Sequence, residues 1–267
     1  MTPTPRMLNI GCGRRFHPSW VNVDIAPHDP SVMHADVSQG IPFPDHHFDV
    51  VYHSHMIEHM RVDDVQRFLG DCLRVLKRGG IMRVATPDLE RLCAAYLERL
   101  RANATADHEW LVIELLDQTV RERSGGAMLE YLRRDPLPNE AFVLERIGEE
   151  GRELLAAIRG AVPSAAPTPR RGLRRRLKDA LVTRWYGADA LLAMQIGRFR
   201  LSGEAHQWLY DQLSLKRVLA AAGFCDPAVR AAGDSAIAGW REFFLEITPA
   251  GDVIKPDSMF MEARKPA

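Results

Sequence analysis

The sequence predicts an α/β fold with a mostly parallel, Rossmann-like sheet, and two observations support this prediction. Over about the first hundred residues, short and almost continuously apolar runs alternate with a helical pattern. Continuous apolar runs are typical of strands buried on both faces, and their alternation with helices is typical of a parallel sheet. Because open sheets of this kind bind ligands beyond the carboxyl ends of their strands, we expect the functional residues where the strands end.

The expected elements follow from the spacing of the apolar residues. Strands are expected at residues 7–10, 21–25, just before 36, at 48–52 and at 81–85. Apolar residues at three- and four-residue steps from Val65 to Leu76 predict a helix before the last of these strands. Late in the chain, residues 214–222 predict a helix closed by Gly223, and residues 259–263 predict a final strand.

The alternation stops after Pro87, where the composition becomes helical. Residues 163–169 contain three prolines and predict a linker, because proline at this density breaks both helices and strands. A basic run at residues 170–178 then opens another helix, expected to reach about residue 196. We therefore expect an α/β core formed by residues 1–100 and 201–267, with a helical insertion at residues 101–200 that acts as a lid.

The composition excludes several classes of protein. Lys and Arg together number 35, as do Asp and Glu, so the formal net charge is zero and a nucleic-acid binder is not expected. Four cysteines without a CxxC pair indicate neither a zinc knuckle nor a disulfide framework. The sequence shows no signal-peptide pattern and no apolar run of 18 residues, so we expect a soluble, cytoplasmic protein without a transmembrane segment.

A glycine-containing turn after the first strand is the first candidate site. Gly11 and Gly13, which flank Cys12, allow the backbone to approach a ligand closely. The dinucleotide fingerprint would require a third glycine at position 16, where Phe16 stands, and an acidic residue about 20 positions further on. The turn therefore argues against a nicotinamide dinucleotide.

Two carboxylates follow the next strands. Asp24 stands at the end of the second strand and suits a ribose diol, whose hydroxyls donate charge-assisted hydrogen bonds to a carboxylate. Asp36 follows the third strand, where it would reach an adenine edge. The alternative is that both residues are ordinary caps of strand ends.

Five ordered motifs resemble those of class I S-adenosylmethionine-dependent methyltransferases. They lie at residues 8–13 (LNIGCG), 20–24 (WVNVD), 41–51 (IPFPDHHFDVV), 57–59 (IEH) and 73–80 (LRVLKRGG). The resemblance implies a seven-stranded sheet and S-adenosylmethionine as the cofactor. The cofactor-binding residues that it implies are Gly11, Cys12, Gly13, Asp24, Ile25, Asp36, Val37 and His53. The chain departs from the commoner pattern in its short first crossover and in Arg15, which stands where a further glycine is usual.

Later motifs at residues 206–211, 214–215, 222–224 and 255–258 resemble a branch often met among bacterial surface-glycan biosynthesis proteins. This resemblance implies that the enzyme methylates a hydroxyl of a sugar, a glycan or a related small molecule. Two alternatives stay open. In the first, the acceptor would be an amine or a carboxylate of a natural product. In the second, the chain would be a catalytically silent binding module that retains the cofactor fold.

A histidine cluster follows the fourth strand. Transfer of a methyl group to a hydroxyl requires a base near neutral pH, and histidine suits that role. We expect His53 or His55 to be the base, with His206 as a second candidate; the alternative is that each is a satisfied polar residue. Residues 55–59 also spell the HxxEH motif of zinc peptidases, but a third ligand and an embedding helix are not indicated, so no metal is expected.

The basic run and nearby aromatic residues bear on the partner. Six positive charges at residues 170–178 are either a solvated helix start or a site for an anionic or lipid-linked acceptor, with weak membrane-surface contact as a further option. Leu173, Leu177 and Leu181 give that helix an apolar stripe, suited to packing or to an interface. The aromatic residues Trp185, Tyr186, Trp208 and Tyr210 either stack on the acceptor or belong to the core. The oligomeric state is left open.

Overall fold

The computed structural model describes residues 5–160 and 173–267, which fall into two compact units. Unit 1 contains Met1–Ala95, Arg146–Gly148 and Gln207–Ala267. Unit 2 contains Tyr96–Glu145 and Glu149–His206. The expected Pro-rich linker at residues 163–169 and the first residues of the basic run lie outside the described residues.

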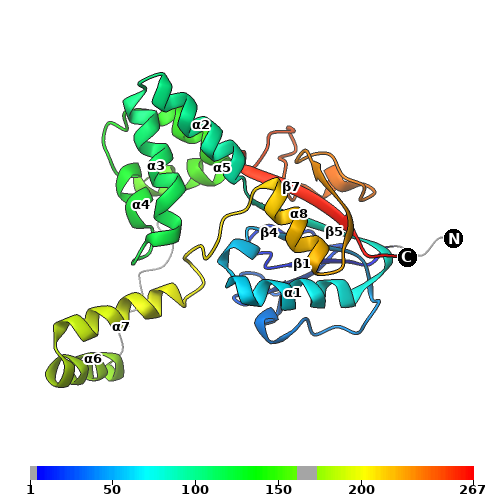
Figure 1. Cartoon of the computed structure of the whole chain (residues 1–267), viewed down its shortest axis with the longest axis horizontal. Helices are drawn as coiled ribbons and strands as arrows, with labels where there is room; N and C mark the ends of the chain where they lie inside the picture. The colour runs from blue at the N-terminus through cyan, green and yellow to red at the C-terminus, as the bar shows by residue number, and fades with distance from the viewer. Residues whose placement is uncertain (1–4, 161–172) are drawn as a thin grey trace. The chain divides into compact units, whose positions relative to one another are not determined.

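Unit 1 is built on a seven-stranded sheet with the strand order β3-β2-β1-β4-β5-β7-β6 (Figure 1). The strands are β1 (Met7–Ile10), β2 (Val21–Asp24), β3 (Met33–His34), β4 (Phe48–Ser54), β5 (Leu76–Pro87), β6 (Cys225–Arg230) and β7 (Ser258–Arg264). Only β7 runs antiparallel to its neighbours, β5 and β6. The prediction of a mostly parallel, Rossmann-like sheet is confirmed.

Helices α1 (Val62–Val75) and α8 (Gln212–Ala221) cover one face of this sheet (Figure 1). Their buried residues on that face are Val65, Phe68, Leu69, Cys72, Val75, Leu215 and Leu219. Helix α8 begins earlier than its apolar spacing predicts, because Asp211 and Ser214 form a capping box in which Asp211 Oδ1 accepts the Ser214 N–H at 2.7 Å. In the sheet itself, the parallel pairing of β4 with β1 and β5 places the carboxyl ends of these three strands beside one another.

The other face of the sheet lacks a crossover helix after β1. Residues 11–20 form turns, as Pro18 predicts, and two buried amides satisfy their backbone. Asn9 Nδ2 donates to the carbonyl of Arg15 at 3.0 Å, and Asn22 Nδ2 donates to the carbonyls of His17 and Trp20, both at 3.0 Å. The short crossover is therefore an ordered loop, held by strand asparagines instead of by helical hydrogen bonds.

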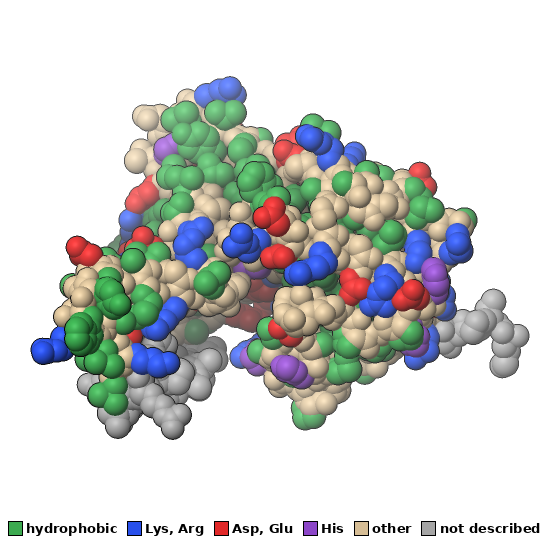
Figure 2. Space-filling model, turned by 60° about the horizontal axis from the view of Figure 1, so that its bottom comes forward, with side chains coloured by type: hydrophobic (Ala, Val, Ile, Leu, Met, Phe, Trp, Pro, Cys, Tyr) green, Lys and Arg blue, Asp and Glu red, His purple; other side chains and the backbone are tan. Residues whose placement is uncertain are grey.

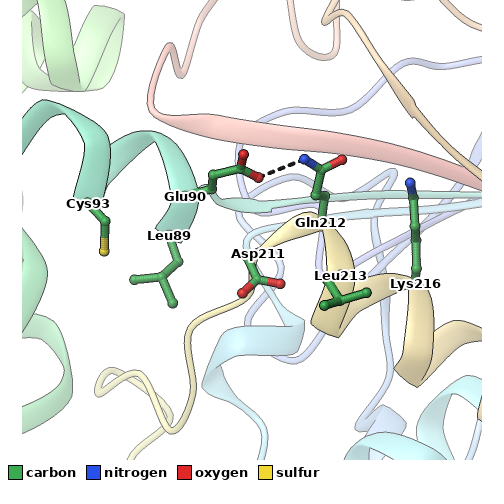
Figure 3. Close-up of a pocket in the computed structure, with 7 residues that line it drawn as sticks. All are labelled: Leu89, Glu90, Cys93, Asp211, Gln212, Leu213 and Lys216. Atoms are coloured by element: carbon green, nitrogen blue, oxygen red, sulfur yellow. Dashed lines mark hydrogen bonds between the residues drawn. The ribbon is translucent and has the colours of Figure 1, made fainter.

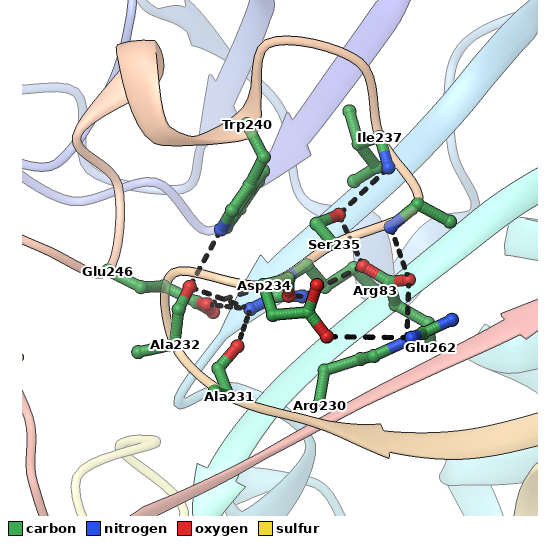
Figure 4. A network of polar contacts seen from close by, with 11 residues as sticks. Arg83, Arg230, Ala231, Ala232, Asp234, Ser235, Ile237, Trp240, Glu246 and Glu262 are labelled. Carbon is green, nitrogen blue, oxygen red and sulfur yellow. Dashed lines mark hydrogen bonds and ion pairs between the residues drawn. The ribbon is translucent and has the colours of Figure 1, made fainter.

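A buried charge network attaches the segment between β6 and β7 to this face (Figure 4). The Arg83 side chain on β5 is fully buried and pairs with Glu262 at 2.8 Å and with Glu246. Its guanidinium also donates to the carbonyls of Asp234 and Ala232 and lies 4.3 Å from the centre of the Trp240 ring. Trp240, in η3 (Trp240–Phe243), packs with Trp20 and Tyr52, so aromatic and ionic contacts cover the sheet where a helix is missing.

The edge strand β6 was not expected from the sequence. It contains Pro227 and a register shift between Cys225 and Ala228, and most of its residues are partly exposed. Proline and irregular pairing are typical of edge strands, and they remove the alternation by which a strand is recognised. The strand β5 is longer than expected, because it begins at Leu76 and includes Gly79 and Gly80.

Unit 2 is helical, as its composition predicts. Helix α2 (Leu89–Arg101) enters it from unit 1, and α3 (Thr105–Val120), α4 (Gly126–Leu132), α5 (Glu140–Ile158), α6 (Leu173–Tyr186) and α7 (Ala188–Arg200) follow. The single helix expected between the basic run and residue 196 is two helices, because Gly187 adopts a positive φ of 88° between α6 and α7. Among the helices of the described ranges, none is long and apolar enough to cross a membrane.

Candidate active site

The turn after β1 consists of two glycines with left-handed backbone. Gly11 has φ +63° and Gly13 has φ +53°, a region that residues with a side chain rarely adopt. A Cβ atom at Gly11 would lie only 2.8 Å from Sδ of Met56, whereas a Cβ atom at Gly13 would have no neighbour within 4 Å. The turn therefore packs tightly on one side and leaves open space beside Gly13, as a close backbone approach to a ligand requires.

The Asp24 carboxylate connects this turn to the end of β2. Its Oδ2 accepts the Gly13 N–H at 2.8 Å, and its Oδ1 accepts the Ala26 N–H at 2.8 Å. Each carboxylate oxygen has a further lone pair for a donor such as a ribose hydroxyl. A left-handed glycine turn beside a fixed, partly exposed carboxylate fits the methionine and ribose parts of S-adenosylmethionine.

The residues expected around adenine lie on the adjoining strand ends. Ile25, directly after β2, exposes 63% of its surface. Asp36 and Val37 follow β3, where the Asp36 side chain caps the short η1 helix (Val37–Gln39) by accepting the Ser38 N–H at 3.0 Å. These hydrogen bonds from Ser38 lower the pKa of Asp36. The capping alternative is therefore realised at Asp36, although its role toward adenine stays a prediction.

Cys12, between the two glycines, is buried, and burial raises the pKa of its thiol to about 11. The side chain therefore stays protonated near neutral pH and is a poor nucleophile. Its neighbour Arg14 is exposed, and Arg15 is partly buried with its carbonyl bound by Asn9.

His53 lies near the end of β4, paired in register with Ile10 of β1. Its side chain is fully buried against Phe68 of α1, with ring centroids 5.4 Å apart. Desolvation lowers the pKa of His53 to about 4, so the imidazole is neutral at physiological pH. A fully buried ring cannot reach an acceptor in this conformation, which argues against His53 as the general base.

His55 lies at the edge of the site and joins two distant segments. Its Nε2 lies 2.7 Å from Oγ of Ser258, the first residue of β7, and its Nδ1 lies 3.2 Å from Oε1 of Glu58. Glu58 is fully buried, and its Oε2 accepts the Thr86 hydroxyl at 3.1 Å. The His55 backbone is left-handed, at φ +49°, and is held by its N–H bond to the Ala85 carbonyl. The side chain is 15% exposed, so of the two strand-end histidines it is the accessible one.

The same geometry argues against the zinc-peptidase interpretation of residues 55–59. That chemistry requires both histidines of the motif on one α-helix. Here His55 has left-handed backbone and precedes the short 3₁₀ helix η2 (Ile57–His59). The motif instead places Glu58 behind His55, as a buried carboxylate partner.

His206, the other expected base, belongs to unit 2. It is buried, and its backbone N–H donates to the carbonyl of Gln118 at 2.8 Å. Its catalytic role stays a prediction. Of the four aromatic residues considered earlier, Tyr210 belongs to the core, whereas Trp208, Trp185 and Tyr186 are exposed.

A cavity of about 480 Å³ opens in unit 1 where β5 ends and helices α2 and α8 begin (Figure 3). It is lined by Leu89, Glu90, Cys93, Asp211, Gln212, Leu213 and Lys216. Gln212 Nε2 donates to Glu90 Oε2 at 2.8 Å across it. The backbone connects this cavity to the His55 segment, because the Asp88 N–H donates to the carbonyl of Asp257, the residue before Ser258. The lining offers apolar contacts together with groups that bind hydroxyls.

Sequence reasoning missed Ser258 and Thr86 as partners of the site. Ser258 closes the KPDS motif at residues 255–258, but spacing along the chain gave no sign that it would meet a histidine 203 positions away. Thr86 stands at the end of an otherwise apolar strand, where a buried hydroxyl needs a hydrogen-bond partner. This need was the feature of the sequence that could have indicated its role in the site.

Comparison with known protein families finds one match. Residues 8–84, which run from β1 into β5, match the family described as Methyltransferase domain. No curated protein matches the chain.

Several solved structures are similar to the chain at low identity. They include the CurJ carbon methyltransferase (11% identity, 100% of this chain and 50% of that chain, TM-score 0.40), a SAM-dependent methyltransferase from Archaeoglobus fulgidus (13%, 98% and 87%, 0.40) and a possible histamine N-methyltransferase from Thermotoga maritima (12%, 99% and 84%, 0.39). The chain spans half the length of the first of these. At these scores the similarities transfer neither a substrate nor an active-site residue.

The family match covers the glycine turn, Asp24 and the His55 segment, and the geometry of these residues suits the same cofactor. Residues 8–84 are therefore a methyltransferase domain.

Proposed function

We propose that this methyltransferase transfers the methyl group to a hydroxyl of a sugar, a glycan or a related small molecule, with His55 as the general base. The observation that carries the proposal is the polar array in which His55 lies between Glu58, 3.2 Å from its Nδ1, and Ser258, 2.7 Å from its Nε2. The later sequence motifs that resemble glycan-biosynthesis proteins support a sugar as the acceptor.

The residues of the first three strand ends would hold the cofactor. Gly11 and Gly13 would lie against its methionine part, Asp24 would accept from its ribose, and Asp36 and Val37 would lie near adenine. When bound, S-adenosylmethionine supplies an electrophilic methyl group. The remaining task of the protein is to position the acceptor oxygen and to remove its proton.

The array sets the proton positions of His55. Glu58 Oε1 lies 3.2 Å from Nδ1, so we propose that this carboxylate holds the proton on Nδ1 and leaves the imidazole lone pair on Nε2. Ser258 Oγ lies 2.7 Å from Nε2 and, in this proposed tautomer, would donate to the lone pair in the absence of an acceptor. An acceptor hydroxyl that takes the place of this donor would be polarised by Nε2 and would transfer its proton there as the new O–C bond forms.

A base of this kind favours a hydroxyl over the other acceptors. A carboxylate acceptor is already ionised near neutral pH, and an amine attacks as its neutral form through a free lone pair. A sugar hydroxyl stays protonated, so it gains most from a positioned base, which typically contributes about 10²–10⁴-fold. The Ser258 side chain is itself buried, which argues against a role as a nucleophile in acyl transfer.

The cavity at the start of α2 and α8 is the proposed acceptor side of the site. Its volume suits a small molecule or the terminal unit of a glycan. Gln212 and Glu90 would bind acceptor hydroxyls there, since both side chains face the cavity (Figure 3). We expect Gln212→Leu to raise the acceptor KM and to leave the cofactor Kd unchanged.

The function is tested by release of S-adenosylhomocysteine with three matched acceptor panels that carry hydroxyl, amine or carboxylate groups. We expect turnover with the hydroxyl panel and a loss of about 10²-fold or more in His55→Asn. His28→Asn, a change at an exposed histidine outside the array, is the control. Turnover confined to amines or carboxylates would overturn the choice of acceptor, and full activity of His55→Asn would overturn the base.

The binding-module alternative is separated by the same measurements. A catalytically silent protein would bind the cofactor in calorimetry but release no S-adenosylhomocysteine with any panel.

A further inference from the structure

Helices α6 and α7 of unit 2 expose a set of large apolar side chains. Leu177, Leu181 and Trp185 follow one another at four-residue steps along α6, and they are 58%, 56% and 74% exposed. Tyr186, at the end of α6, is 78% exposed, and Leu192 of α7 is 55% exposed. Residues at four-residue steps share one face of a helix, so α6 presents an apolar stripe to its surroundings.

The two helices bury little of their own apolar surface. In the described part of the chain, α7 has no buried residue, and the buried residue of α6 is Asp179. Asp179 pairs with Arg198 of α7 at 3.3 Å, so an ion pair joins the two helices. A helical pair inside a globular unit normally turns its apolar side inward, whereas this pair leaves that side exposed.

The same helices are strongly basic. Residues 173–200 contain seven Lys or Arg and two Asp, although the whole chain has a net charge of zero. Lys178 and Arg184 are exposed and flank the apolar stripe. In the space-filling view, hydrophobic and basic side chains lie next to one another on this part of the surface (Figure 2, lower left).

We infer that α6 and α7 form a docking surface for an anionic lipid bilayer. Exposed Leu residues insert into the boundary between headgroups and acyl chains, and Trp and Tyr are the residues that favour this boundary. Basic residues beside them are attracted to anionic headgroups. Complementary charge selects this partner over a second copy of the chain, because two copies of a basic surface repel each other.

The surface is defined here as Leu177, Lys178, Leu181, Arg184, Trp185, Tyr186 and Leu192. It is carried by unit 2 alone and by none of the residues assigned to the cofactor or to the His55 array. The inference therefore stands or fails independently of the proposed reaction. It assigns α6 and α7 the task of holding the enzyme at a membrane, where a lipid-linked acceptor would be found.

Binding is measured by flotation of the full chain with two kinds of vesicle, one of phosphatidylcholine and one containing about 30% phosphatidylglycerol. We expect co-flotation with the anionic vesicles at low salt, a weaker interaction with the neutral ones, and release as salt screens the basic residues. Absence of flotation with anionic vesicles at low salt overturns the inference.

Matched variants locate the surface. The double change Leu177→Ser and Leu181→Ser is compared with Leu116→Ser and Val120→Ser, which alter two exposed apolar residues of α3 at the same spacing. Lys178→Glu with Arg184→Glu is compared with Arg133→Glu and Arg217→Glu, which are exposed elsewhere. We expect the α6 variants to reduce the bound fraction at least about tenfold and the controls to leave it unchanged. Equal flotation of all variants would overturn the assignment to α6.

Tryptophan fluorescence gives a second readout. In a Trp208→Phe background, Trp185 is the exposed tryptophan, since Trp20, Trp110 and Trp240 are buried. We expect its emission to shift to the blue on anionic vesicles and to be quenched by lipids brominated near the headgroup. Circular dichroism checks that the variants fold. The wild-type protein could instead dimerise in solution and lose this dimerisation in the Leu177→Ser and Leu181→Ser variant. That result would overturn the inference, because the partner of the surface would then be a second copy of the chain.

Discussion

His55 Nε2 and Ser258 Oγ lie 2.7 Å apart, although 203 positions separate the two residues in the chain. The antiparallel direction of β7 is what brings them together. Pro87, at the carboxyl end of β5, pairs with Ser258, at the amino end of β7. The edge of the sheet that collects the carboxyl ends of the parallel strands therefore also receives the beginning of β7, and with it a hydroxyl for His55.

The first prediction concerns the carboxylate behind His55. Glu58→Gln places an amide where the carboxylate accepted from Nδ1, so it favours the opposite tautomer and removes the lone pair from Nε2. We expect kcat to fall at least about tenfold, with the acceptor KM and the cofactor Kd unchanged. Ser258→Ala leaves Nε2 intact and should lower kcat less than His55→Asn does. Steady-state kinetics of both variants test this, with Glu242→Gln, a change at an exposed carboxylate, as the control. An unchanged kcat in Glu58→Gln would contradict a positioning role for Glu58.

The second prediction concerns Asp24. Asp24→Asn keeps the shape of the side chain but removes the charge that strengthens hydrogen bonds from a ribose diol. We expect the calorimetric Kd for S-adenosylmethionine to rise about 10- to 100-fold. Asp252→Asn, a change at an exposed carboxylate away from the turn, should leave the Kd unaltered. Equal affinity of wild type and Asp24→Asn would remove Asp24 from the cofactor site.

The third prediction uses the open space beside Gly13. Both Gly13→Ala and Gly79→Ala place a methyl group on left-handed backbone with no atom within 4 Å of the new Cβ. Each should therefore cost about 1–2 kcal/mol of folding stability. Only Gly13→Ala should weaken cofactor binding, since we expect the cofactor in that space. Thermal unfolding and calorimetry together distinguish the two effects, and unchanged affinity in Gly13→Ala would show that the space serves another purpose.

The fourth prediction concerns pH and the buried His53. Its pKa of about 4 lies below the ordinary 6.5, so its contribution to stability is present above pH 6.5 and is lost as the pH falls toward 4. The lost contribution amounts to roughly 3 kcal/mol at pH 4. Burial raises the pKa of Glu246 from 4.5 to about 7. The contribution of Glu246 to folding stability therefore depends on pH in the opposite direction to that of His53: it is present below pH 4.5 and is lost as the pH rises through 7.

The two groups oppose each other between pH 4.5 and 6.5. We expect His53→Leu to remove the acid-sensitive contribution, so that the free energy of unfolding falls as the pH rises through this window. Urea unfolding at several pH values measures this slope. A His53→Leu variant with the pH profile of the wild type would show that His53 is protonated equally in the folded and unfolded states.

The fifth prediction concerns the buried network around Arg83. Arg83→Met leaves the carboxylates of Glu246 and Glu262 buried without their guanidinium, and we expect it to destabilise unit 1 by about 3–5 kcal/mol. Glu262, whose pKa is lowered by its hydrogen bonds, is the carboxylate that stays ionised, so adding Glu262→Gln to that variant removes the uncompensated charge and should restore part of the loss. Urea unfolding of the single and double variants measures the difference. A loss below about 1 kcal/mol in Arg83→Met would show that the network contributes little.

The parallel part of the sheet could be predicted from the sequence because its strands carry their own signal. The strand β1 is a continuous apolar run that ends at Gly11, and the heptad-like spacing from Val65 identifies α1. The missing crossover helix was also predictable, because Pro18 and the short segment before Trp20 leave no room for one. What could not be predicted is how the buried amides of Asn9 and Asn22 stabilise that loop.

The candidate site was predictable only in part, for a physical reason. Gly13 and Asp24 are 11 positions apart and are joined by two neighbouring strands, so local patterns place them together. Ser258 of β7 contacts His55, and Thr86 of β5 donates to Glu58, and no local spacing reports contacts between segments so distant in sequence. The sequence likewise did not distinguish His53 from His55, because both stand where β4 ends and only packing against Phe68 buries one of them.

The position of β7 has a consequence for the synthesis of the protein. This strand follows every other strand in the sequence, yet it lies between β5 and β6 in the sheet. A chain emerging from the ribosome can pair β1 to β5 early, whereas β6 has no neighbour until β7 has been made. Ser258 arrives with that last strand, so a nascent chain completes its sheet and its His55 pair in one late folding step.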